Sequence, residues 1–176
     1  MRLLLAAALA VGFTTSAFAA DKGVTVELGG MKSTTPADWK EEQPSSTMRL
    51  TQFKLPKAEG DKDDAELALF AFPGGSGSLE QNLKRQEAKF EINGKPEVTE
   101  IKIGDIKGAY QDIKGTFLKK FPPFAPDAKI TKMGDYRQIY VVFEAGGKQY
   151  YMTLLGPAKT IEKHKAGFDA WVKNFK

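Results

Sequence analysis

The segment Glu66–Phe90 (ELALFAFPGGSGSLEQNLKRQEAKF) joins a strand pattern to a helix pattern through a glycine-rich turn. Its first seven residues are almost all apolar, which is typical of a central strand with both faces covered. Glycine and serine fill all five positions 74–78, and apolar residues then recur near helical spacing. Ser78 and Gln81 match the capping box that opens many helices. The segment therefore predicts a buried strand, a turn and a helix in direct succession.

Strand patterns continue on both sides of this segment. The clearest hairpin lies on the C-terminal side, where Tyr136–Glu144 and Lys148–Leu155 flank the turn Ala145-Gly146-Gly147. The stretch 119–134 before it is rich in proline, and we interpret it as a long loop. Four further strands are predicted at Val24–Leu28, Met48–Leu55, Val98–Ile103 and Ala109–Leu118.

A final helix is predicted from Gly156-Pro157 to about Phe175, because proline is tolerated in the first turn of a helix. Its apolar residues form one stripe, which should cover a face of the sheet: Ile161, Phe168, Trp171, Val172 and Phe175. The whole pattern predicts an α+β fold, an antiparallel β-sheet of about six strands flanked by helices.

The N-terminus has the arrangement of a secretory signal peptide. Met1-Arg2 is a basic start, Leu3–Val11 is apolar, and Ala17-Phe18-Ala19 is a small-x-small cleavage site. The apolar run is too short to span a bilayer, which takes roughly 20 residues. We expect residues 1–19 to be removed and residues 20–176 to form a single domain, either periplasmic or secreted and not membrane-spanning.

Two parts of the chain resemble the PsbP-like family of exported proteins. The first is LFAFPGGSGSLEQNLKRQEAKF, and the second is the Tyr-rich strand that runs into Gly156-Pro157-Ala158-Lys159-Thr160 and the last helix. The resemblance implies an α/β/α sandwich, a fold that the extrinsic photosystem II protein shares with a yeast nuclear Ran-binding protein. The nearest likeness is to small bacterial exported proteins of unknown function, so neither activity is transferred to this chain.

The composition argues against several functional classes. The chain has no cysteine, which excludes disulfides, thiolate chemistry and an anchor on a lipidated cysteine. Its one histidine, His164, leaves little for a zinc site or for activating a nucleophile. The basic residues are mostly lysines interleaved with acids, which is typical of a solvated surface and not of a nucleic-acid site. We expect no cofactor, metal, nucleic-acid partner or catalytic residue, and a monomer.

The best candidate for partner binding is the run Phe121, Pro122, Pro123 and Phe124. Prolines stiffen the chain, and two phenylalanines supply apolar area that a partner can cover. The alternative is a loop that folds back so that both rings cover the core.

The candidates for anion binding are Gly75, Ser76, Gly77 and Ser78, since backbone N–H groups before a helix can hold a phosphate or carboxylate. The turn lacks the lysine and spacing of a P-loop, so a plain glycine-rich connection is the alternative. The acidic turn 59–66 is a weaker candidate, for calcium, and a hydrated hairpin turn is its alternative.

His164 is expected at the surface or boundary of the last helix, because the neighbouring sequence offers no catalytic partner for it. We therefore predict an exported, non-catalytic binding or accessory domain for a protein, glycan or envelope surface. The alternative is a carrier for a small molecule or anion that uses a cleft near Gly74–Ser78.

Overall fold

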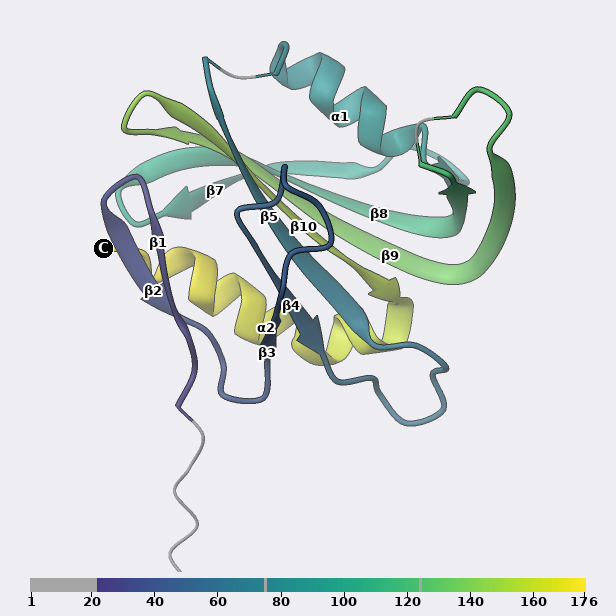
Figure 1. Cartoon of the computed structure of the whole chain (residues 1–176), viewed down its shortest axis with the longest axis horizontal. Coiled ribbons are helices and arrows are strands. Elements are labelled where there is room, and N and C mark those ends of the chain that lie inside the picture. Colours follow the sequence, from purple (N-terminus) through teal and green to yellow (C-terminus); the bar gives the residue numbers. More distant parts are fainter. Residues whose placement is uncertain (1–21, 75, 124) are drawn as a thin grey trace, which may run out of the picture.

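The computed structural model describes residues 22–74, 76–123 and 125–176 (Figure 1). The predicted signal peptide and the candidate residues Gly75 and Phe124 lie outside these ranges. The strands are β1 (Thr25–Leu28), β2 (Met31–Thr34), β3 (Lys40–Glu42), β4 (Thr51–Leu55), β5 (Ala65–Pro73), β6 (Phe90–Glu91), β7 (Glu97–Ile103), β8 (Ile106–Phe121), β9 (Lys129–Ala145) and β10 (Lys148–Pro157), and the helices are α1 (Leu79–Glu87) and α2 (Ala158–Lys173).

The main sheet is antiparallel and has eight strands in the described residues, against about six in the prediction. Its order is β3-β4-β5-β10-β9-β8-β6, and β7 pairs with the other half of β8. The extra strands, β3 and β6, are three and two residues long, too short for any side-chain periodicity to show. The predicted central strand is confirmed, since β5 lies between β4 and β10.

Helix α2 covers one face of this sheet, which we call the α2 face (Figure 1). The predicted stripe is confirmed, because all five of its residues are buried: Ile161, Phe168, Trp171, Val172 and Phe175. Trp39 packs against them, with its ring centroid 5.7 Å from that of Trp171. The small sheet of β1 and β2 adds Val26 and Leu28 to the same core.

Helix α1 lies over the opposite face of the sheet, which we call the α1 face (Figure 1). The capping box is confirmed, because the Ser78 hydroxyl accepts from Gln81 N–H while the Gln81 side chain accepts from Ser78 N–H. The predicted apolar stripe is only partly right. Leu79 is 44% exposed, and the buried residues of α1 are Asn82 and Gln86.

The predicted long loop at 119–134 is wrong, because most of it is strand. β8 continues to Phe121 and β9 begins at Lys129, with these two residues paired across the hairpin. The prolines lie inside the connecting turn, where the ladder needs no N–H donor. The stretch was misread because its strands pair mainly with each other and lack a core-facing apolar pattern.

Candidate functional site

The outer part of the β8–β9 hairpin forms an arm, which we define as residues 115–121 and 129–136. In β9, only residues from Tyr136 onward pair with β10, and residues 129–133 pair with β8 alone. The register shifts between Gly115 and Phe117, and Asp135 has φ of 54°, so the hairpin is irregular where the arm begins. Figure 1 shows both strands curving away from β5 and β10 there.

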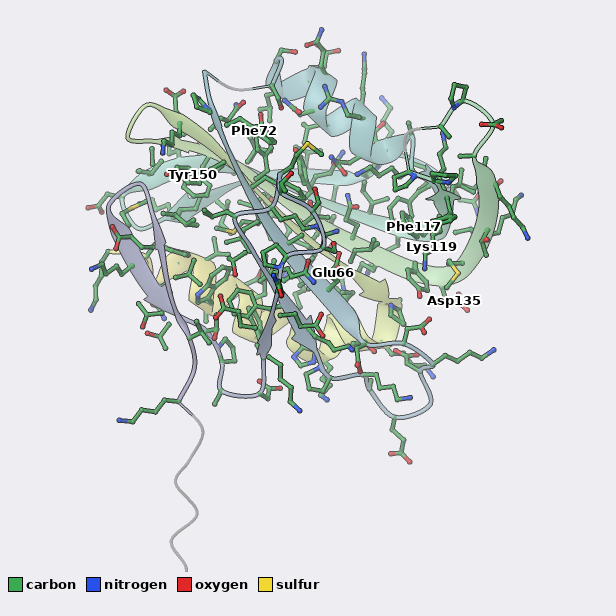
Figure 2. The ribbon with its side chains drawn as sticks, viewed as in Figure 1. Glu66, Phe72, Phe117, Lys119, Asp135 and Tyr150 are labelled. Carbon is green, nitrogen blue, oxygen red and sulfur yellow. The ribbon has the colours of Figure 1, made fainter. Side chains whose placement is uncertain are left out.

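The base of the arm is fixed to the body of the protein. The Phe117 ring lies 5.3 Å from Phe90 in β6 and 6.0 Å from Tyr136, measured between centroids. Leu118 N–H donates to the Lys89 carbonyl oxygen over 2.8 Å. Figure 2 places Phe117, Lys119 and Asp135 together on the arm, well apart from Tyr150 and Phe72. The base of the arm is therefore fixed by contacts with β6 and with the segment before it, whereas its far end extends beyond these contacts.

The end of the arm exposes apolar side chains. Phe121 is 72% exposed and Ile130 is 49% exposed. Phe121 is thus not folded onto the core, which was the alternative interpretation of this segment. Phe121 is the last residue of β8, and Pro122 and Pro123 follow it outside any strand. Partner binding by this run remains a prediction.

Three lysines surround these apolar side chains. Lys119, Lys120 and Lys129 are exposed, and no acid of the described residues lies within ion-pair distance of them. At the base, by contrast, Lys132 pairs with Glu91 over 2.6 Å. Segment 119–129 contains those three lysines and one acid, Asp127, so its formal charge is +3 − 1 = +2. The end of the arm is apolar and cationic at once.

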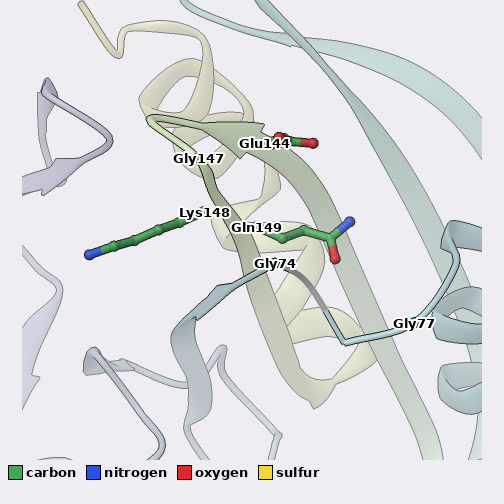
Figure 3. A pocket seen from close by; sticks show the side chains of 6 residues that line it. All are labelled: Gly74, Gly77, Glu144, Gly147, Lys148 and Gln149. Carbon is green, nitrogen blue, oxygen red and sulfur yellow. The ribbon is translucent and has the colours of Figure 1, made fainter.

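A small pocket of about 170 Å³ lies beside the glycine-rich turn (Figure 3). Figure 3 shows Glu144 and Gln149 on one side of the β9–β10 turn and Lys148 extending to the other. The lysine charge is therefore directed away, while a carboxylate faces the pocket. Its lining is Gly74, Gly77, Glu144, Gly147, Lys148 and Gln149.

Two of the predicted anion-binding residues already use their N–H groups internally. Ser76 N–H donates to the Tyr151 hydroxyl oxygen over 3.1 Å, and its own hydroxyl lies 2.8 Å from the same oxygen. Tyr151 in turn donates to Gln149 Oε1. Ser78 N–H donates to Gln81 over 3.0 Å. An anion would have to displace these contacts, so the turn is built as a helix start, and anion binding there remains a prediction.

A buried polar layer, which the sequence did not predict, lies beneath α1. Gln138 Nε2 donates to Gln86 Oε1 over 3.2 Å, and Lys89 Nζ donates to the same oxygen over 2.7 Å. Burial, with the nearby Arg85 charge, lowers the pKa of Lys89. Gln111 and Gln138 each leave a buried amide oxygen without a partner among the described residues. Each of these glutamines is the only one in its strand, Gln111 in β8 and Gln138 in β9, so no local pattern marks them.

An ion cluster on the α2 face was also missed. Arg137 is 4% exposed, and its guanidinium donates to both Asp112 carboxylate oxygens, over 2.8 and 2.5 Å. A third bond reaches Glu162 in α2 over 2.5 Å. Hydrogen bonds to Asp112 outweigh burial and raise the pKa of Arg137, so it stays charged. The cluster joins the sheet to α2.

The expectation for His164 is wrong, because the residue is buried. Its Nε2 donates to the Pro56 carbonyl oxygen over 2.8 Å, and its ring lies against Trp39 with the centroids 6.4 Å apart. The histidine thus ties α2 to the segment after β4. The i, i+3 and i+4 relation to Ile161 and Phe168 was the available signal.

The acidic turn directs its carboxylates to separate partners. Asp61 accepts from Thr160 N–H and hydroxyl over 2.9 and 2.6 Å, at the start of α2. Asp63 accepts from the Tyr136 hydroxyl, and Asp64 accepts from Lys57 N–H. Across the described ranges no group of three or more acids or histidines is placed to hold a metal ion. In the same ranges no helix is long and apolar enough to cross a membrane.

Comparison with solved structures finds a likeness to cyanobacterial PsbP from Synechocystis sp. PCC 6803. The two chains are 11% identical, the match covers 94% of this chain and 97% of that one, and the TM-score is 0.54. The chain has a PsbP-like fold. The likeness to a Ran-binding protein stays a prediction.

Two further solved structures match with lower TM-scores. One is a protein from Bacteroides thetaiotaomicron VPI-5482, at 15% identity over 89% of this chain, with a TM-score of 0.49; this chain spans about half of that protein's length, 48%. The other is a protein of unknown function from Pseudomonas aeruginosa, at 14% identity over 86% of this chain and 94% of that one, with a TM-score of 0.47. No family model and no curated protein matches the chain.

Proposed function

We propose that this chain is an exported, non-catalytic binding domain that contacts a partner at the cell envelope through the end of the β8–β9 arm. The main support for this proposal is the position of Phe121. Its side chain is 72% exposed at the end of a hairpin whose base is fixed by the contact between Phe117 and Phe90. A large aromatic side chain held away from the core adds no packing to the fold, and such exposed apolar groups mark interaction sites.

The chemistry of the described residues supports a binding role over catalysis. His164, the one histidine, is committed to the Pro56 carbonyl oxygen and lies beneath Trp39. The Ser76 hydroxyl lies 2.8 Å from the Tyr151 hydroxyl and 3.5 Å from Asn82 Oδ1, and neither of these partners is a general base at neutral pH. The PsbP-like fold and the signal-peptide pattern agree with an accessory domain that acts after export.

Site-specific crosslinking in the native envelope fraction tests this proposal. A photo-crosslinking amino acid replaces Phe121 in residues 20–176, and a matched variant carries it at Val98, which is 48% exposed on β7 and lies off the arm. We expect a reproducible crosslinked product from position 121 that unlabelled protein competes away, and none from position 98. Equal labelling from the two positions, or none from 121, would contradict the proposal.

A small-molecule carrier is the second candidate, because a pocket lies at the predicted turn. Its Glu144 carboxylate and the internal bonds of Ser76 and Ser78 favour a neutral or cationic polar ligand over an anion. Titration with inorganic phosphate, followed through the amide signals of residues 74–80, shows whether the turn binds an anion or prefers a neutral or cationic ligand. If these signals shift at submillimolar phosphate, the turn binds anions after all.

A further inference from the structure

The end of the arm carries apolar and basic side chains on both faces of the hairpin. In the antiparallel register Phe121 lies opposite Lys129, and Lys120 lies opposite Ile130. Adjacent residues of a strand point to opposite faces, so Phe121 and Ile130 lie on different faces, each beside a lysine. A flat partner surface would cover only one of these faces. An environment that surrounds the end of the hairpin would cover both.

The connecting turn is suited to partial burial. Pro122, Pro123 and Pro126 have no backbone N–H, so three donors that would need a partner on leaving water are absent. The basic residues here are all lysines, and residues 115–136 contain no arginine. Lysine acts as a flexible point charge, whereas arginine is preferred where a protein partner requires fixed bidentate pairing. These features favour a diffuse anionic surface.

We propose that the end of the arm docks reversibly on a bilayer that contains anionic phospholipid. The Phe121 ring enters the interfacial region, and Lys119, Lys120 and Lys129 lie over the lipid phosphates. This inference rests on the proposed function, since it names the surface that the arm contacts. Apolar insertion and electrostatic attraction add in such binding, and neither alone gives stable attachment.

The loss of vesicle binding expected for each variant follows from these two contributions, the electrostatic and the apolar. Each lysine near an anionic membrane surface strengthens binding about fivefold, so removing three weakens it by about a hundredfold. Removing the apolar ring of Phe121 should weaken binding by about tenfold or more. Salt should release the protein, because the lysines are exposed and screening at physiological ionic strength is effective.

Vesicle sedimentation tests the proposal with residues 20–176. The vesicles contain phosphatidylcholine with phosphatidylglycerol in equal parts, and pure phosphatidylcholine vesicles are the comparison. The variants are Lys119→Gln/Lys120→Gln/Lys129→Gln and Phe121→Ser. Their matched controls are Lys102→Gln/Lys159→Gln/Lys173→Gln, three exposed lysines elsewhere, and Val98→Ser. An unchanged melting temperature by circular dichroism shows that each variant is folded.

We expect the wild type to bind only the phosphatidylglycerol vesicles, the arm variants to lose that binding, and the control variants to keep it. Absence of wild-type binding, or equal loss in the matched triple variant, overturns the lipid inference. Crosslinking from position 121 then decides the proposed function separately. A protein crosslink there, without vesicle binding, keeps the proposed function and replaces the lipid with a protein partner.

Discussion

The α2 face and the end of the β8–β9 arm use aromatic side chains in opposite ways. On the α2 face, Trp39, Phe168 and Trp171 are buried and lie with ring centroids 5.7 to 6.5 Å apart. On the arm, Phe121 is exposed and lies among unpaired lysines of the described chain. The first arrangement stabilises the fold, whereas the second contributes little to it. Packing on one face of the sheet stabilises the fold, and the proposed binding uses the end of one hairpin, so we expect that each can be changed without the other.

The largest expected effect is on the α2 face. Trp171→Ala should lower the free energy of unfolding by about 3–5 kcal/mol, because it leaves a cavity among fully buried rings. Urea denaturation measures the change. Phe121→Ala is the matched aromatic truncation and should change stability by less than about 0.5 kcal/mol, since its ring has little packing to lose. Equal losses in the two variants would remove the distinction between the regions.

The buried ion cluster should give the next largest effect. Asp112→Ala leaves Arg137 buried with only Glu162 as a partner, so a loss of about 3 kcal/mol is expected, at the low end for a broken buried pair. The double variant Asp112→Ala/Arg137→Met should recover much of this loss in the same urea experiment. If the double variant is no more stable than the single one, the cost does not come from the unpaired charge.

The cap of α1 should have a smaller and more local effect. Ser78→Ala removes the acceptor for Gln81 N–H and should cost about 1 kcal/mol. Because α1 contacts the sheet through the Gln86–Gln138 hydrogen bond and the partly buried Leu83, hydrogen exchange should rise in α1 before it rises in β9 or β10. A uniform rise across the sheet would show that α1 is part of one cooperative unit with the α2 face.

The smallest expected effect on stability at neutral pH is that of the Tyr110 hydroxyl. Its titration changes the free energy of unfolding only in alkaline solution. Burial raises the pKa of Tyr110 to about 12, above its usual value near 10. The folded state holds the phenol proton more tightly, so this contribution to stability is complete below pH 10 and is lost as pH rises from 10 to about 12. Comparing the urea unfolding of wild type and Tyr110→Phe across that range measures it. The wild type should lose more stability than the variant, and parallel losses would contradict the assigned shift.

Much of the fold could be predicted because several of its elements carry a strong local sequence pattern. The stripe from Ile161 to Phe175, the hairpin around Gly146-Gly147 and the cap at Ser78 each follow from local sequence. Strand β6 is two residues long, and its existence depends on a pairing with Phe117 that no local pattern encodes. The outer parts of β8 and β9, residues 119–121 and 129–133, were not predicted as strand for a similar reason. They pair with each other, face solvent and show no core-facing apolar pattern.

The candidate site was only partly accessible from sequence. The Phe121–Phe124 run was selected for its composition, but its place at the end of a strand pair needs the register of β8 on β9. The lysines that flank it are spread over 119–129 and come together only through that register. The burial of Arg137, Gln138 and Gln111 could not be predicted from the sequence. A polar residue in a strand suggests a solvent-facing position unless both faces of the sheet are known to be covered.

Binding at the end of the arm can be followed directly in amide spectra of isotope-labelled residues 20–176 as native envelope vesicles are added. We expect the signals of residues 117–133 to broaden first, while those of the α2 face and of Gly74, Gly77 and 144–149 stay sharp. Early broadening confined to the pocket residues would contradict it and make the carrier the better description. Uniform broadening at the lowest vesicle concentration would contradict the assignment of binding to the arm.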